Sequence, residues 1–124
     1  MKVLLGIGGS DDSLRALEAT VERAAEAGDD LTVAVVDNPE SSRSPETVAE
    51  LVESHLERTD HDLDVDVRRL EGHPGSALVE LAESEGFDRI VLGGGQTSPL
   101  GKINVGSIAE FVLLNSHVTV TLVR

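Results

Sequence analysis

Apolar residues of this chain occur in two strand-like patterns. Mostly apolar runs at 2–8, 31–36 and 90–92 are typical of strands that are buried on both faces of a sheet. Residues 63–70 and 118–123 instead alternate apolar and polar side chains, which is typical of strands with one face in water. The pattern therefore predicts five strands, with the third and the fifth at the edges of the sheet.

Between these strands, apolar residues recur at the three- and four-residue spacing of amphipathic helices. The first helix is expected after the turn at 9–12 and before Gly28, a residue suited to a helix C-terminus. The second has Pro45 at its first position, the third follows 72–75, and the fourth has Ser107 as a natural N-cap. The residues predicted to face the core are Leu14, Leu17, Val21 and Ala24, then Val48, Leu51, Val52 and His55, then Leu78, Leu81 and Ala82, and finally Ile108, Phe111 and Val112.

The order of these elements along residues 1–124 defines the fold class. Strands alternate with four helices through short connections, which is typical of a single α/β domain, a three-layer sandwich around a five-stranded parallel sheet. With the third and fifth strands at the edges, the strand order is 3-2-1-4-5. The order reverses between strands one and four, and ligands of such sheets bind at the carboxyl ends of the strands at that switch point.

Two glycine-rich segments follow the strands that flank the switch point. Residues 8–10 (Gly-Gly-Ser) follow the first strand, and three glycines at 93–95 follow the fourth. Glycine permits positive φ angles and a close approach of the backbone to a ligand. Gly106 and Ser107 then open the fourth helix, whose first amides and dipole suit an anion. Together these features predict a phosphate pocket.

Two common nucleotide motifs do not fit these glycines. The Walker A pattern fails because Gly95 and Gly101 are one residue too far apart, and Ile103 stands where a hydroxyl is needed. The dinucleotide fingerprint fails because Asp11 occupies the place of its last glycine, although Asp37 ends the second strand where a ribose-binding acid would lie. The predicted pocket follows neither pattern.

A third pattern fits far better. Residues 90–124 closely resemble the C-terminal signature of the universal stress protein family, which is a strand, G-x-x-G-x9-G-[ST], a helix and a final strand. The resemblance extends over the whole chain, through the Gly-Ser turn after the first strand, the Val36-Asp37 end of the second and the segment 72–74 before the third helix. It implies an adenine nucleotide alpha hydrolase-like fold.

The family includes members that bind ATP or related adenine nucleotides and members that do not. The resemblance implies a weakened base clamp, because Gly8 stands where nucleotide-binding members have an aspartate that bonds adenine. Val36 or its neighbour Val35 matches the residue that packs on the base, and Gln96 replaces the second glycine of the signature. The expected nucleotide-binding residues are Ile7, Gly8, Gly9, Ser10, Val36, Leu92, Gly93, Gly95, Gln96, Lys102, Gly106, Ser107 and Ile108.

Within this set, Lys102 has two interpretations. It lies in the loop before the fourth helix, where its ammonium could reach a phosphate as a point charge. The alternative is an exposed lysine that is only solvated. The expected ligand is ATP or AMP, with Mg²⁺ bound only together with the nucleotide.

The charge balance narrows the class of partners. The chain has 23 acidic and 10 basic residues, for a net charge of −13, which argues against a nucleic-acid partner. Such acidity suggests adaptation to concentrated salt, with greater stability in molar KCl than at low salt; an ordinary acidic protein is the alternative. No apolar run approaches the ~20 residues of a membrane span, no leader peptide is evident, and cysteine is absent, so a cytoplasmic protein is expected.

The sequence does not suggest an enzyme. Its four histidines are scattered without a metal-binding spacing, and no serine and histidine are placed as a nucleophile with its base. A slow ATPase has no support beyond the pocket itself. We therefore expect a stress-linked regulatory protein, homodimeric through the alternating strand 118–123. Two hypotheses remain, a nucleotide-binding module and an interaction module whose pocket takes no nucleotide.

Overall fold

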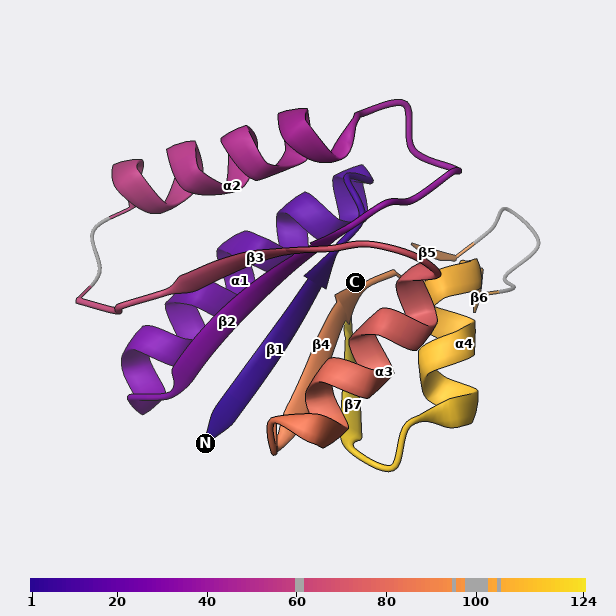
Figure 1. Ribbon diagram of the computed structural model, residues 1–124. Coiled ribbons are helices and arrows are strands. Elements are labelled where there is room, and N and C mark those ends of the chain that lie inside the picture. Colours follow the sequence, from indigo (N-terminus) through magenta and orange to yellow (C-terminus); the bar gives the residue numbers. More distant parts are fainter. Residues whose placement is uncertain (60–61, 95, 98–102, 105) are drawn as a thin grey trace.

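A parallel sheet forms the middle layer of the structure, a computed structural model that describes residues 1–59, 62–94, 96–97, 103–104 and 106–124 (Figure 1). Over these residues the order of the main sheet is β3-β2-β1-β4-β7, which confirms the predicted order 3-2-1-4-5. A short antiparallel pair, β5–β6, was not predicted. The strands are β1 (Lys2–Ile7), β2 (Asp30–Val36), β3 (Asp66–Leu70), β4 (Arg89–Gly93), β5 (Gln96–Thr97), β6 (Ile103–Asn104) and β7 (Thr119–Val123).

Helices cover both faces of the sheet. In Figure 1, α1 (Asp11–Ala27) and α2 (Pro45–Arg58) lie on one face, and α3 (Pro74–Ser84) and α4 (Ser107–Asn115) lie on the other. Among the described residues, no helix is both long enough and apolar enough to cross a lipid bilayer.

The central strand β1 contributes to two separate cores. Leu5 is fully buried among side chains from α1 and α2, which we call the α1–α2 core. Leu4 is fully buried among side chains from α3 and α4, which we call the α3–α4 core. Consecutive side chains of a strand point to opposite faces, so a continuous apolar run supplies both cores at once.

The predicted helix starts are mostly confirmed, and each has a local cause. Ser10 caps α1 by accepting a hydrogen bond from the Ser13 amide at 3.1 Å, and Ser44 caps α2 ahead of Pro45. The first helix ends at Gly28, whose φ of 72° is left-handed. The prediction for Ser107 was wrong. Gly106, with φ 83°, is the N-cap of α4 and makes no side-chain cap bond, whereas Ser107 is the first helical residue.

Two further predictions need correction. Leu51 does not face the core but is 36% exposed, because the buried stripe of α2 consists of Val48 and Val52 alone. The third strand begins at Asp66 rather than at residue 63, because the ladder with β2 runs only from Asp66 to Leu70. Leu63 and Val65 nevertheless pack against the α1–α2 core from outside the ladder.

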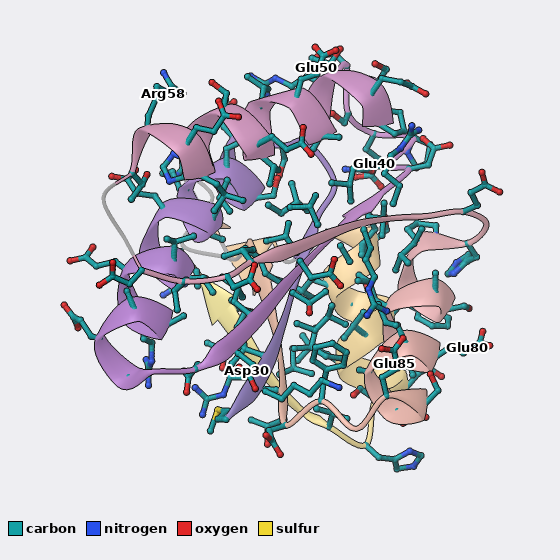
Figure 2. The ribbon with its side chains drawn as sticks, turned by 60° about the vertical axis from the view of Figure 1, so that its left-hand side comes forward. Asp30, Glu40, Glu50, Arg58, Glu80 and Glu85 are labelled. Carbon is teal, nitrogen blue, oxygen red and sulfur yellow. The ribbon has the colours of Figure 1, made fainter. Side chains whose placement is uncertain are left out.

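Acidic side chains cover the outer surface. Figure 2 shows the carboxylates of Glu50 and Glu80 pointing away from the sheet. Hydrogen bonds from Arg68 lower the pKa of Glu85, and hydrogen bonds from His117 lower the pKa of Glu83. These contacts stabilise the fold above the usual carboxyl pKa of 4.5, and this contribution is lost as the pH falls through the lowered values. Neither carboxylate lines the cavity described below.

Candidate functional site

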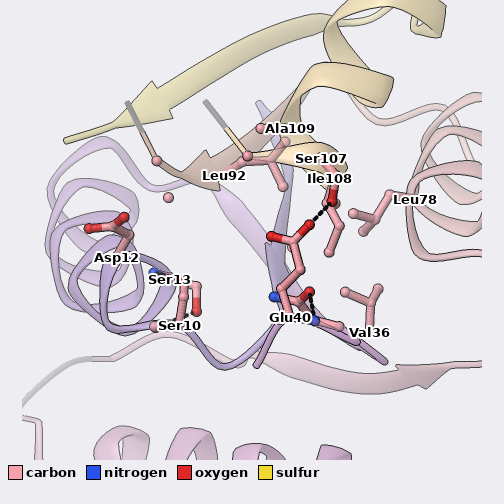
Figure 3. Close-up of a pocket in the computed structure, with 16 residues that line it drawn as sticks. Ser10, Asp12, Ser13, Val36, Glu40, Leu78, Leu92, Ser107, Ile108 and Ala109 are labelled. Atoms are coloured by element: carbon pink, nitrogen blue, oxygen red, sulfur yellow. Dashed lines mark hydrogen bonds between the residues drawn. The ribbon is translucent and has the colours of Figure 1, made fainter. Parts of the chain in front are cut away.

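A cavity of about 240 Å³ opens at the carboxyl ends of β1 and β4, at the predicted switch point (Figure 3). Its walls come from the β1–α1 turn, the end of β2, the loop after β2, α3, the end of β4 and the start of α4. The lining residues are Gly6, Gly8, Ser10, Asp12, Ser13, Val36, Asn38, Glu40, Leu78, Leu92, Gly93, Gly94, Gly106, Ser107, Ile108 and Ala109.

The structure brings most of the predicted site residues together. Lining the cavity are Gly8, Ser10, Val36, Leu92, Gly93, Gly106, Ser107 and Ile108. Between the two candidates on β2, Val36 lines the cavity, whereas Val35 lies in the α1–α2 core. The alternation of side chains along β2 explains this choice.

The remaining predicted residues do not line the cavity or lie outside the residues that the structure describes. Ile7 is fully buried in the α1–α2 core, on the face of β1 opposite the cavity. Gly9, with φ 90°, is not among the lining residues, and a Cβ there would lie 2.7 Å from a methyl of Val48. Gly95 and Lys102 lie outside the described residues. For Gln96 only the backbone is described, where it pairs with Asn104.

The end of β4 passes very close to the first turn of α1. A Cβ on Gly93 would stand 2.3 Å from the carbonyl oxygen of Asp12 and 2.7 Å from the amide nitrogen of Ser13. No side chain fits between two backbone segments at that distance, so glycine is required here for packing alone. The same approach brings the β4 loop and the start of α1 to one side of the cavity.

A polar contact crosses the cavity at the start of α4. The hydroxyl of Ser107 donates a hydrogen bond to Oε1 of Glu40 at 2.8 Å, between residues 67 positions apart in the chain. Figure 3 shows the Glu40 side chain reaching across the cavity to this helix start. Among the described lining residues, the charged side chains are Asp12 and Glu40, both acidic. The site that the sequence predicts to bind a phosphate is therefore lined by two carboxylates.

Apolar side chains line another part of the cavity wall, with Val36, Leu78 and Leu92. Asn38 adds a side-chain amide there. A Cβ on Gly8 would lie 3.0 Å from Cβ and 3.2 Å from Nδ2 of Asn38, so Asn38 lies where a larger residue at position 8 would project. Its Oδ1 accepts the Glu40 amide at 3.0 Å, which leaves the NH₂ group beside Gly8.

Several of the lining residues that sequence reasoning missed come from loops and helix faces. Asp12, Asn38, Glu40 and Leu78 belong to no motif and only meet in three dimensions. For Leu78 the helical spacing indicated burial but not the cavity. Within the described ranges, no three His, Asp or Glu side chains are grouped as metal ligands.

A five-stranded parallel sheet of this order, with a cavity at the switch point between backbone amides and apolar side chains, is typical of nucleotide-binding α/β domains. The profile of the universal stress protein family matches residues 1–124, and the chain belongs to that family.

Known relatives agree with this assignment. A universal stress protein of Methanocaldococcus jannaschii is 42% identical over 55 residues; this match covers 44% of the chain and only 32% of that protein. One similar solved structure is a crystal structure of a universal stress protein in complex with cAMP. Its sequence is 28% identical to this chain, its TM-score is 0.75, and the match covers 100% of this chain and 96% of that one. The universal stress protein from Archaeoglobus fulgidus in complex with dAMP is 18% identical, with a TM-score of 0.71, over 100% and 98% of the two chains. The likeness to the latter shows the fold alone.

Proposed function

We propose that this protein is a stress-response regulatory protein that binds an adenine nucleotide in the cavity between β1 and β4. The observation that carries the proposal is that one cavity wall combines two chemically different kinds of group. Gly93, Gly106 and the start of α4 supply backbone groups, and Val36, Leu78 and Leu92 supply apolar side chains. Amides at a helix start suit a phosphate, and apolar side chains suit the faces of a base.

Two further considerations support the proposal. The relative with cAMP shares the fold over the full length of this chain. The Asn38 side-chain amide lines the cavity beside Gly8, where a polar group can contact the edge of a base. The proposed role is binding rather than turnover, in the cytoplasm, and Mg²⁺ is expected only as a companion of a bound nucleotide.

Filling the cavity is expected to weaken nucleotide binding strongly without unfolding the protein. Ile108 is half-buried and lines the cavity from the first turn of α4, so Ile108→Trp places an indole in the space proposed for the ligand. Isothermal titration calorimetry with AMP and cAMP should show binding to the wild type and at least about a tenfold loss in this variant. Leu114→Trp is the matched control, because Leu114 lies on the same helix, is 76% exposed and does not line the cavity.

The alternative is a homodimeric interaction module that takes no nucleotide. The Glu40–Ser107 contact and the glycine at position 8 favour it, since both reduce the likeness to a nucleotide site. Absence of heat and of a thermal shift with millimolar AMP, cAMP and ATP would decide for this alternative.

We further propose that the protein dimerises through β7. Among the residues that the structure describes, β7 pairs with β4 alone and forms an edge of the sheet. The Val123 carbonyl accepts the Gly94 amide, so the backbone groups of Val123 point towards β4 and those of Val120, three residues earlier, point outward. An outward row of unpaired amides invites pairing with the same strand of a second copy.

A proline at an outward position of β7 is expected to convert the dimer to a monomer. Val120→Pro removes one outward N–H at a position where an edge strand tolerates proline. Val120→Ala is the control, because it loses the same side-chain packing and keeps the N–H. Light scattering at micromolar protein should give a dimer mass for the wild type and for Val120→Ala, and a monomer mass for Val120→Pro. A wild-type protein that is already monomeric would refute the interface.

A further inference from the structure

We propose that Glu40 makes the nucleotide site select by charge, favouring ligands with a single phosphate over polyphosphates. This inference rests on the proposed function and names the class of ligand that the site takes. The Glu40 carboxylate bonds Ser107 at the first turn of α4, which is the place that the helix start offers to a phosphate. A bound phosphate must displace this carboxylate or lie beside it.

The loop after β2 holds Glu40 in this position. The Glu40 amide donates to Oδ1 of Asn38 at 3.0 Å, and the Ser41 amide donates to the Asn38 carbonyl at 3.0 Å, which closes a tight turn. Arg43 then anchors the loop, because its guanidinium donates to the Gly9 carbonyl at 2.6 Å. The turn and this anchor direct the Glu40 side chain across the cavity (Figure 3).

The two described arginines near the cavity, Arg43 and Arg15, already pair with other groups of the protein. Arg43, on the same loop as Glu40, also bonds the Asp11 carboxylate at 3.2 Å. Arg15 pairs with Asp12, the second acidic residue of the cavity wall. Among the described lining residues there is no lysine, arginine or histidine. Arg15 compensates the charge of Asp12, so the repulsion from Glu40 is the part that grows with each negative charge that a ligand brings.

This arrangement suits a ligand with little negative charge. A cyclic nucleotide carries one charge, AMP about two and ATP about four. Like charges within a few ångströms repel even where solvent screens them, and Glu40 is exposed, so the repulsion should depend on salt. We therefore expect affinity to decrease in the order cAMP, AMP, ADP, ATP at low ionic strength, and the differences to shrink in molar KCl.

The test is a charge series on two matched variants. Glu40→Gln removes the carboxylate and keeps the hydrogen-bond acceptor for Ser107. Glu50→Gln makes the same change of net charge at an exposed site on α2 that does not line the cavity. Affinities for cAMP, AMP, ADP and ATP are measured by calorimetry with and without Mg²⁺. Each titration is done twice, once at the lowest KCl concentration at which circular dichroism shows a fully folded protein, and once in molar KCl. At low salt, Glu40→Gln should bind ATP on the order of tenfold more tightly than the wild type, and cAMP only about threefold more tightly, whereas Glu50→Gln should match the wild type.

Three outcomes would overturn the inference, and they differ from failure of the proposed function. Equal affinities for cAMP and ATP in the wild type would show that the site does not select by charge. Unchanged ATP affinity in Glu40→Gln would show that Glu40 has no part in the selection. A Mg²⁺-dependent ATP affinity that falls in Glu40→Gln would make Glu40 a metal ligand instead. If no nucleotide binds either the wild type or Glu40→Gln, the proposed function itself fails.

Discussion

Replacing Gly93 by alanine is expected to lower the free energy of unfolding by about 3 kcal/mol, the upper end of the range for overpacking. The added methyl group would stand 2.3 Å from the Asp12 carbonyl oxygen and 2.7 Å from the Ser13 nitrogen. Both contacts are backbone atoms in the first turn of α1, which cannot rotate away as a side chain can. Either α1 or the end of β4 must therefore move. Urea unfolding followed by circular dichroism measures the loss.

Two other glycines provide the control for this prediction. Gly28 and Gly86 have φ of 72° and 68°, and a Cβ at either would meet no atom within 4 Å. Their alanine variants test backbone strain without a clash, and each should lose about 1 kcal/mol. If Gly93→Ala cost no more than Gly28→Ala, the close approach of β4 to α1 would be wrong, and with it one wall of the cavity.

The second large effect concerns neighbouring residues of the central strand. Leu4→Ala and Leu5→Ala should each lower the free energy of unfolding by about 3 kcal/mol, because each removes a fully buried side chain from a different core. The two losses should add in the double variant, since the side chains lie on opposite faces of the sheet and share no packing partner in the two cores.

The exposed leucine of α4 is the matched control for this pair. Leu114 is 76% exposed, and Leu114→Ala should change the free energy of unfolding by no more than about 0.5 kcal/mol. Urea unfolding of the four variants measures all of these values under one condition. A strongly non-additive double variant would contradict the assignment of Leu4 and Leu5 to separate cores.

The architecture could be predicted because its determinants are local in sequence. Alternation at 63–70 and 118–123 identified the edge strands, and their position fixed the strand order. The turn at 9–12 and Pro45 precede amphipathic segments, so the first two helix starts were evident without tertiary information. The β5–β6 pair could not be predicted, because two-residue strands have no periodicity.

The site was predicted where its residues end a strand or open a helix, which covers its glycines and also Ser10, Val36, Leu92, Ser107 and Ile108. Glycines at 8 and 93 mark the ends of two strands, and the structure places both on the cavity wall. Alternation along β1 could have excluded Ile7, which is two residues from Leu5 and shares its face. By contrast, nothing local separates Gly106 from Ser107 as a cap, since both residue types are common there. The Glu40–Ser107 bond joins segments 67 residues apart, and no pattern within one segment encodes it.

Mapping of a bound nucleotide by nuclear magnetic resonance tests the central claim most directly. The claim is that the cavity between β1 and β4 binds an adenine nucleotide through the backbone at the start of α4. Titrating isotope-labelled protein with AMP should shift the amide signals of Gly8, Gly93, Ser107 and Ile108 in a saturable way, and leave that of Leu114 in place. Shifts confined to another surface, such as the edge strand β7, or no shift with millimolar AMP and cAMP, would contradict the account.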